Sequence, residues 1–167
     1  VGKMLGLGYP AGPVVDKLAK RGDPKFIDFP RAMIHEANYD FSFSGLKTSV
    51  LYWFKKQASV EGQLLNDVCA SFQRAIVDTL ALKTFKASKQ YGVNAIVAVG
   101  GVSANSELRE RFANDAAKLG MKFFTPRPLF STDNAAMIAM LAALKLERGL
   151  TDDLSLRTAP RAPLASR

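Results

Sequence analysis

A short apolar run that ends in two glycines constrains the fold of this chain most strongly. Residues 95–99 read Ala-Ile-Val-Ala-Val, and Gly100 and Gly101 follow at once. The run is too short for a helix, and its β-branched residues favour a buried strand. Because a glycine pair interrupts regular structure, the pattern predicts a central strand that stops at this turn.

Two helical patterns and one alternating pattern stand in the first third of the chain. A short helix is expected where Pro13 occupies the first turn, a position at which its missing N–H costs nothing. Residues 39–44 alternate in the manner of a strand, with Phe41 and Phe43 toward the core. An apolar helix with a basic end is expected over residues 46–54.

The longest helix is expected directly before the apolar run. Asn66 or Asp67 can cap its start, because both side chains accept hydrogen bonds from the free N–H groups of a first turn. The helical spacing of apolar residues continues to about Tyr91. Gly92 then stops the helix, since glycine adopts the backbone conformation that commonly ends one.

The pattern repeats after the glycine pair. A helix is expected over residues 106–119 and a second short strand over residues 121–124. Thr132 or Asp133 is expected to cap a last helix that carries residues 136–148. Alternation of helices and strands is typical of α/β proteins, so we expect an at least partly parallel sheet covered by helices.

Composition permits one compact domain with a basic surface. The chain has 167 residues, of which 48% are hydrophobic, and this excludes a wholly disordered chain. Its 23 Lys and Arg against 15 Asp and Glu leave a net charge of +8. Such an excess favours a polyanionic partner, because lysines that neutralise phosphates release counterions. A solvated basic surface that keeps the protein soluble explains the same charge.

Other features bear on the compartment and on the completeness of the chain. Cys69 is the only cysteine, so no intrachain disulfide can form, and its apolar helical setting favours a buried structural thiol. No apolar run approaches the ~18 residues of a membrane span, and we expect a cytoplasmic protein. The chain opens with Val1 rather than Met, which predicts a piece of something longer.

The glycine turn is a candidate nucleotide site. Ligands of open α/β sheets bind beyond the carboxyl ends of the strands. Gly100 and Gly101 would let the backbone approach a nucleotide, and the start of the next helix offers free N–H groups and a partial positive charge. Asn105 can cap that helix or bond a ribose or a base. A tight turn without a ligand is the alternative interpretation.

Asp133 is a candidate metal ligand at the start of the last helix. An aspartate in that place is commonly a helix cap, which is the simpler interpretation. A carboxylate at the carboxyl edge of the sheet can also hold a metal ion. Because Asn105 and Asp133 both follow strands of one sheet, we expect their side chains to face one cleft.

Two further features carry less information. Ser44, Gly45 and Lys47 are a candidate anion site, but they lie outside any GxxxxGK pattern and do not form a P-loop. His35 is the only histidine, and beside Glu36 it is expected at the surface. One histidine and one cysteine do not suffice for a zinc site built from this chain alone.

Five segments of the chain match, in order, the motifs of one family: residues 6–13, 29–31, 40–48, 100–105 and 131–139. Together they resemble the universal tRNA adenosine threonylcarbamoyltransferases in their bacterial form, formerly labelled O-sialoglycoprotein endopeptidases. The resemblance extends from Val1 to about Leu150. It implies the second lobe of the two-lobed actin-like fold, with a mixed sheet flanked by helices, over residues 1–150. It leaves residues 151–167 as a basic, mobile tail and the amino-terminal lobe missing.

The resemblance also assigns roles to residues. Gly12 and Asp16 are implied to contact the nucleoside part of the bound adenylate, and Asn105 to bind the ligand beside the turn of Gly100 and Gly101. Asp133 is implied to hold one divalent metal ion, iron or zinc. Its other ligands belong to a His-x-x-x-His pair in the first lobe, and this sequence has no such pair.

Two positions depart from the family pattern. Ala11 stands where a second glycine is usual, and its methyl group is tolerable if the backbone φ is negative. Asp16 is one methylene shorter than the Glu of many relatives, which could lengthen its bond to the ligand or place a water within it. No catalytic residue is assigned.

The implied reaction is transfer of a threonylcarbamoyl group from threonylcarbamoyl-AMP to the adenosine beside the anticodon of tRNA. The implied partners are tRNA, a pseudo-enzyme relative and a small P-loop ATPase. We expect the isolated chain to be inactive, because half of the metal shell and of the nucleotide cleft would be absent. A metal-dependent glycoprotease and a non-catalytic nucleotide-binding or interaction fragment are the alternatives; the former lacks an H-E-x-x-H motif here.

Overall fold

A computed structural model of the chain describes residues 1–157. The chain divides into two units, residues 1–132 and residues 133–167. Residues 158–167, which make up most of the predicted tail, lie outside the described residues. The expected boundary at residue 150 stays a prediction.

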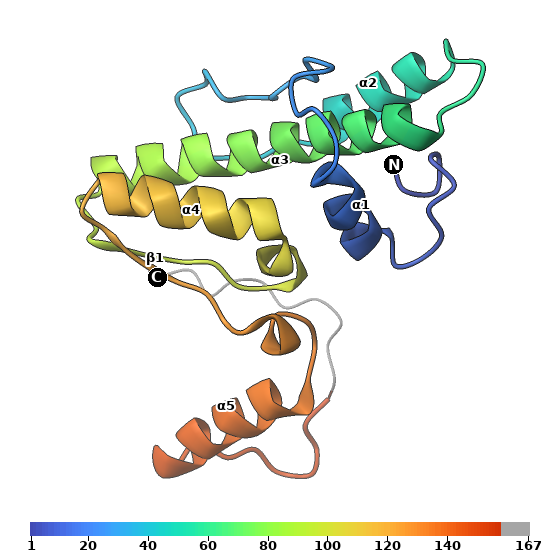
Figure 1. Cartoon of the computed structure of the whole chain (residues 1–167). Coiled ribbons are helices and arrows are strands. Elements are labelled where there is room, and N and C mark those ends of the chain that lie inside the picture. Colours follow the sequence, from blue (N-terminus) through green and yellow to red (C-terminus); the bar gives the residue numbers. More distant parts are fainter. Residues whose placement is uncertain (158–167) are drawn as a thin grey trace. The chain divides into compact units, whose positions relative to one another are not determined.

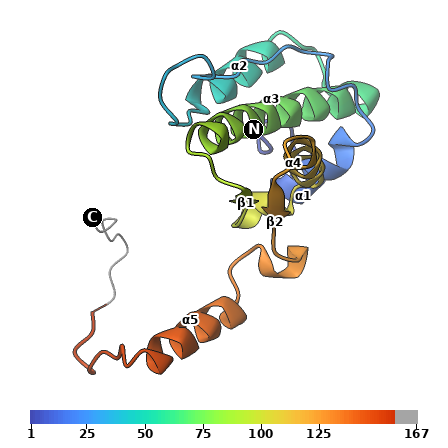
Figure 2. The same ribbon diagram turned by 90° about the vertical axis from the view of Figure 1, so that its left-hand side faces the viewer.

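A long helix is the axis of the first unit. This helix, α3 (Gly62–Gln90), has 29 residues, and α1 (Ala11–Ala19) and α4 (Ser106–Lys118) pack against it. Another helix, α2 (Ser44–Phe54), lies on the side of α3 away from α4 (Figures 1 and 2). Pro13 stands in the first turn of α1, as predicted.

The sheet of the first unit has two parallel strands, β1 (Ala95–Val97) and β2 (Lys122–Phe124). Ile96 pairs with Phe123, and both contact the helices; Val97 pairs with Phe124, and these two are 65% and 53% exposed. The predicted α/β class is confirmed. The prediction of a buried central strand is wrong for the described residues, because β1 has one partner strand and one covered face.

The core consists of two apolar clusters along α3. The first surrounds Phe29, Val50 and Val68, which join the loop before α2, α2 itself and the first half of α3. The second contains an aromatic row in which the ring of Phe112 lies 5.4 Å from that of Phe85 and 5.8 Å from that of Phe123. Burial of each large apolar side chain contributes roughly 1.5–3 kcal/mol. The clusters therefore hold α2 and α4 on α3.

The prediction of a strand over residues 39–44 is wrong. This segment is irregular, Phe41 and Phe43 are exposed, and α2 already begins at Ser44. The reason is a buried lysine on α3. The ammonium group of Lys83, 1% exposed, donates to the backbone oxygen of Asp40 (2.6 Å). A side chain thus satisfies a carbonyl that a strand partner would otherwise satisfy.

The predicted helix caps are partly wrong. α3 begins at Gly62, before Asn66 and Asp67, and its N-cap Glu61 makes no side-chain cap bond. The carboxylate of Asp67 instead accepts from the backbone N–H of Asp23 (2.8 Å), so it fastens a loop. Gly92, with φ of 62°, follows the end of α3 as predicted.

The second unit contains one described helix, α5 (Ala135–Glu147). Its N-cap is Asn134, whose side-chain oxygen accepts from the backbone N–H of Met137 (3.1 Å). The predicted caps, Thr132 and Asp133, are therefore wrong by one or two positions.

Two 3₁₀ turns complete the described elements: η1 (Gly101–Ala104) and η2 (Pro128–Phe130). None of the described helices has the length and hydropathy of a membrane span.

The thiol of Cys69 yields the first testable prediction. It is fully buried, and burial raises the pKa of Cys69 from 9.0 to about 11. At pH 8 the fraction of Cys69 present as the reactive thiolate is therefore about a hundredfold lower in the folded protein than in an unfolded chain. We expect iodoacetamide to alkylate the folded protein at least a hundredfold more slowly than the urea-unfolded protein, as followed by mass spectrometry. Equal rates would contradict the burial.

The same shift has a pH signature. Because the pKa of Cys69 is higher in the folded state than in the unfolded state, the thiol contributes to the stability of the fold below pH 9. This contribution is lost as the pH rises from 9 toward 11, since the thiol of the unfolded chain ionises first. Cys69→Ala removes the titrating group. The free energy of unfolding of the wild type should therefore fall more steeply than that of Cys69→Ala over this range.

Candidate functional site

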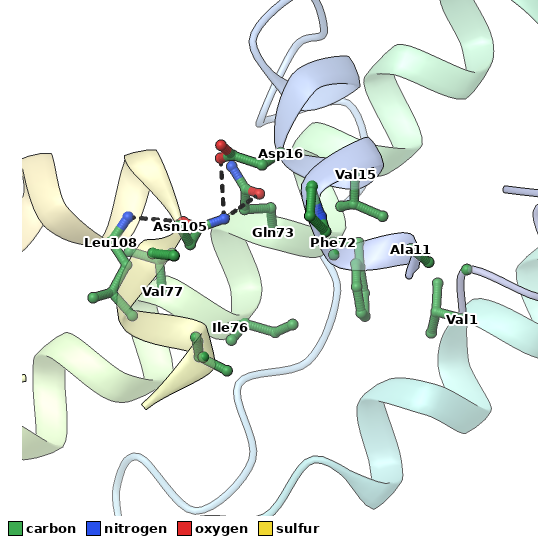
Figure 3. Close-up of a pocket in the computed structure, with 16 residues that line it drawn as sticks. Val1, Ala11, Val15, Asp16, Phe72, Gln73, Ile76, Val77, Asn105 and Leu108 are labelled. Atoms are coloured by element: carbon green, nitrogen blue, oxygen red, sulfur yellow. Dashed lines mark hydrogen bonds between the residues drawn. The ribbon is translucent and has the colours of Figure 1, made fainter. Parts of the chain in front are cut away.

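A pocket of about 510 Å³ lies where α1, α3, η1 and the start of α4 meet (Figure 3). Gly12 and Asp16 reach it from α1, Gly101 from η1, and Asn105 from the N-terminus of α4. The structure therefore brings together four residues that the sequence marked for nucleotide binding. They come from segments about 90 positions apart in the chain, such as Asp16 and Asn105.

The pocket has apolar walls and one polar end. Phe72 and Ile76 of α3 and Val102 of η1 are among the apolar residues that line it, and Asp16, Gln73 and Asn105 supply the polar side chains. A concave apolar site with a few converging polar groups is typical of small-molecule binding, and 510 Å³ lies within the usual range. Such walls suit a flat aromatic base, and the polar end suits hydroxyl or amino groups.

Hydrogen bonds fix the polar end. The side-chain amide of Asn105 donates to Asp16 Oδ1 (3.1 Å) and to Gln73 Oε1 (2.6 Å), as Figure 3 shows. The side-chain oxygen of Asn105 accepts from the backbone N–H of Leu108 (2.9 Å). Asn105 is thus the helix cap that the sequence predicted, and it faces the pocket as well.

Asp16 is the anion at the N-terminus of α4. Its Oδ1 atom accepts from the backbone N–H of Ser106 (3.2 Å) and from the hydroxyl of Ser106 (2.8 Å). Negative charge is stabilised at a helix N-terminus. The expectation that this helix start offers free N–H groups to a ligand is therefore wrong for Ser106 and Leu108, whose N–H groups bind Asp16 and Asn105.

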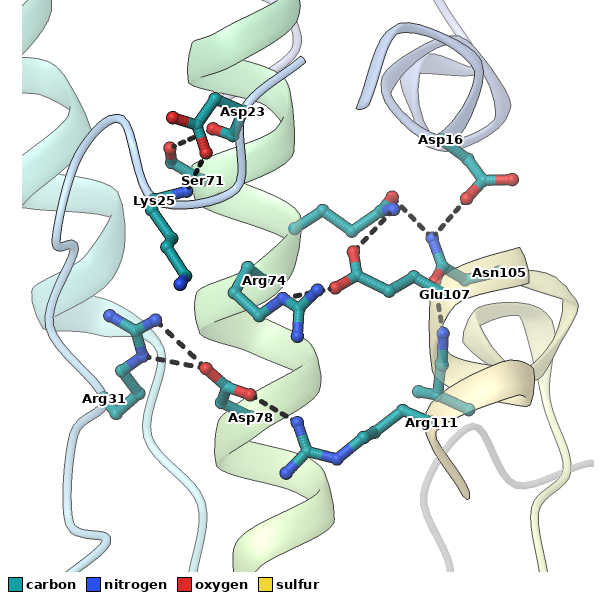
Figure 4. Close-up of polar contacts among 12 residues, drawn as sticks. Asp16, Asp23, Lys25, Arg31, Ser71, Arg74, Asp78, Asn105, Glu107 and Arg111 are labelled. Atoms are coloured by element: carbon teal, nitrogen blue, oxygen red, sulfur yellow. Dashed lines mark hydrogen bonds and ion pairs between the residues drawn. The ribbon is translucent and has the colours of Figure 1, made fainter. Parts of the chain in front are cut away.

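A second layer of charged residues supports this end of the pocket (Figure 4). Glu107 accepts from the side-chain amide of Gln73 (3.0 Å) and pairs with Arg74 (2.6 Å). Further along α3, Asp78 pairs with Arg31 (3.0 Å) and Arg111 (2.8 Å). These contacts fasten α4, and the loop that carries Arg31, to α3.

The sequence interpretation missed Gln73 and Glu107. Gln73 is a polar residue that is buried on α3 beside the apolar residues Phe72 and Ile76. A polar residue on the buried face of a helix requires a partner, since an unpaired buried polar group is costly. That signal was present in the sequence. Glu107 carried no such signal, because an acidic residue in a first helical turn is common.

The glycines differ in their roles. Gly100 has φ of 87°, a conformation that favours glycine, and it directly precedes η1 without lining the pocket. Gly12 and Gly101 line the pocket, and a Cβ added at Gly12 would meet nothing within 4 Å. The expectation for Ala11 is confirmed: it is helical, and its methyl group faces Gly2, where an added Cβ would lie 2.1 Å away.

The remaining predicted residues lie elsewhere. Asp133 is exposed in the second unit, so its convergence with Asn105 on one cleft stays a prediction. No cluster of three or more His, Cys, Asp or Glu side chains suited to a metal occurs among residues 1–157. His35 is exposed, as predicted, and so are Ser44, Gly45 and Lys47.

Comparison with known proteins identifies the family. The family model described as tRNA N6-adenosine threonylcarbamoyltransferase matches residues 1–140. A relative of that name from Chloroherpeton thalassium is 54% identical over 160 residues, which cover 90% of this chain and 46% of the relative. One from Chlorobium phaeobacteroides is 51% identical over 95% of this chain and 48% of its own.

A third relative comes from another organism. The relative from Thermotoga neapolitana, of the same name, is 48% identical over 96% of this chain and 48% of its own length. The chain thus spans about half the length of the curated relatives it matches. The chain belongs to the tRNA N6-adenosine threonylcarbamoyltransferase family.

Proposed function

We propose that this chain forms the nucleotide-holding part of an enzyme that transfers threonylcarbamoyl from threonylcarbamoyl-AMP to an adenosine of tRNA. The observation that carries the proposal is the pocket in which Gly12, Asp16, Gly101 and Asn105 meet. Family membership supplies the reaction, since the relatives are named for it. The pocket supplies a place for the adenylate.

The adenylate would enter with its base between the apolar walls. Phe72, Ile76 and Val102 offer apolar surface to the flat base, and Gly12 leaves room because it has no side chain. Asp16 would accept hydrogen bonds from ribose hydroxyls. Its Oδ1 atom is already engaged by Asn105 and Ser106, so Oδ2 is the atom for this contact. The ammonium group of Lys20 stands 3.9 Å from Oδ2 on the same helix.

In the proposed transfer, the exocyclic amine of adenosine attacks the carbonyl carbon of the donor. A new C–N bond forms, the bond from that carbon to the phosphate oxygen breaks, AMP leaves, and the amine loses one proton. The pocket residues hold the donor and orient its carbonyl group. Holding two reactants in line accelerates a bimolecular step by a large factor, so positioning alone is a substantial contribution.

We further propose the actin-like second lobe for this chain and a divalent metal ion at Asp133. One carboxylate does not complete a coordination shell, because iron or zinc takes four or more ligands. The remaining ligands would come from outside the described residues. A pseudo-enzyme relative, a small P-loop ATPase and a cytoplasmic setting belong to the same proposal.

Gly12 gives the sharpest test of the pocket. We expect Gly12→Val to weaken binding of AMP at least tenfold by calorimetry, because the new side chain projects into the space reserved for the nucleotide. The folded state should melt at or above the wild-type temperature, since no protein atom lies within 4 Å of the added Cβ and valine suits a helix better than glycine.

Gly45→Val is the matched control. Gly45 is also the second residue of a helix, with open space around an added Cβ, and it lies outside the pocket. It should leave AMP binding unchanged. Equal binding by the Gly12 and Gly45 variants would refute the nucleotide site.

Asp133 tests the metal proposal by metal content. Because Asn134 is the cap of α5, Asp133→Asn should melt like the wild type, whereas Asn134→Ala should lose about 1 kcal/mol. In the whole protein we expect Asp133→Asn to lose bound metal, since the charge of the ligand is removed. Wild-type metal content in purified Asp133→Asn would show that Asp133 is no ligand.

Activity of the chain alone tests the division of labour. We expect the 167-residue chain to bind AMP yet to transfer no threonylcarbamoyl to tRNA, because relatives of this activity are about twice as long. Incorporation of labelled threonine into tRNA measures the transfer. Turnover by this chain alone would place the whole catalytic apparatus within it.

A further inference from the structure

The solvent face of α2 has no role in the pocket and carries an unusual set of side chains. A shallow groove runs along it, lined by Ser44, Thr48, Tyr52 and Lys56 among others. Ser44, Thr48 and Tyr52 are four apart within α2, so they form one stripe of the helix, and Lys56 lies just beyond its end at Phe54. The opposite face, with Leu46 and Val50, is buried against the core. The stripe is therefore presented outward by a firmly packed helix.

All charged side chains between Asp40 and Glu61 are positive. Between Asp40 and Glu61 the chain has no carboxylate side chain, while Lys47, Lys55 and Lys56 are all exposed. No ion pair among residues 1–157 involves these three lysines. Other cations of the first unit, such as Arg31, Arg74 and Arg111, are engaged by carboxylates. The α2 lysines thus remain available to an external anion.

The uncharged groups of the stripe narrow the kind of anion. Tyr52 is 62% exposed, and the hydroxyls of Ser44 and Thr48 lie on the same face. Lysines bind phosphates, hydroxyl side chains bind phosphate or ribose oxygens, and an exposed aromatic ring stacks on an unpaired base. An acidic protein surface would use the lysines, and its carboxylates would also accept from hydroxyls, but it would offer no base to the exposed ring of Tyr52.

We propose that the outer face of α2, together with the residues directly after its end, is an RNA-binding surface, on which Lys55 and Lys56 contact phosphates and Tyr52 stacks on a base. The inference rests on the proposed function in one respect, namely that the RNA is tRNA. It assigns the contact to one helix, on the side of α3 away from α4 (Figures 1 and 2). No residue lines both the adenylate pocket and this surface, so the two sites are distinct.

The test is the salt dependence of binding between the 167-residue chain and an unmodified tRNA transcript. Each phosphate contact contributes about 0.7–0.9 to the slope of log K against log salt concentration. The double variant Lys55→Gln/Lys56→Gln should lower that slope by about 1.5 and weaken binding about tenfold at 0.1 M salt. Tyr52→Leu should weaken binding about tenfold with an unchanged slope, and Tyr52→Phe should restore it.

Lys89→Gln/Lys122→Gln is the control of equal charge. Both lysines are exposed, and Lys89 lies at the end of α3 away from α2 (Figure 1). This variant should bind within twofold of the wild type. All variants change exposed side chains, and melting temperatures near that of the wild type verify that they are folded.

The outcomes separate the two proposals. Failure of the wild-type chain to bind tRNA would overturn this inference and the tRNA-binding part of the proposed function. Binding by wild type and α2 variants alike would overturn this inference alone, leave the adenylate pocket untouched, and favour an acidic protein as the partner of α2. An equal loss of tRNA affinity in the Lys89→Gln/Lys122→Gln variant would show that binding depends only on the total charge of the chain. That result would also overturn this inference.

Discussion

One carboxylate oxygen, Oδ1 of Asp16, joins α1 to α4. It accepts from the amide of Asn105 and from the backbone and hydroxyl of Ser106, so the start of α4 is held at a fixed distance from α1. The pocket is the space left between these helices and α3. Its width therefore depends on a carboxylate whose other oxygen, Oδ2, the proposed ligand would use, and ligand binding and local stability are linked through Asp16.

Local chemistry could be predicted from the sequence where one residue has few physical options. A glycine pair after an apolar run predicts a sharp turn, and Gly100 adopts the positive φ that such a turn requires. An Asn directly before a helical pattern predicts a cap, and Asn105 is one. The gathering of Gly12 and Asp16 around that turn followed from family resemblance, because no local pattern relates residues so far apart.

The errors concern features that depend on neighbours in space. The alternation of residues 39–44 satisfies the pattern of a strand, yet the backbone oxygen of Asp40 accepts from the ammonium group of Lys83 instead of from a neighbouring strand. Asp67 is a good cap by residue type, but the loop at Asp23 binds its carboxylate. Residues 95–99 are apolar enough for a central strand, whereas Val97 and Val99 are exposed in the part of the chain that the structure describes. Residue type alone does not identify which group competes for a side chain.

The buried polar residues of α3 have a consequence for how the helix finds its place. Ser71 holds the backbone at Asp23 and Ile27, Gln73 holds Asn105 and Glu107, and Lys83 holds Asn38 and Asp40. Apolar contacts alone tolerate a slip of one helical turn, since one aliphatic side chain replaces another. A slip here would strand several buried polar groups, each at a cost of about 1–3 kcal/mol. The buried polar residues of α3 thus fix a single axial register in which the neighbouring segments can pack against it.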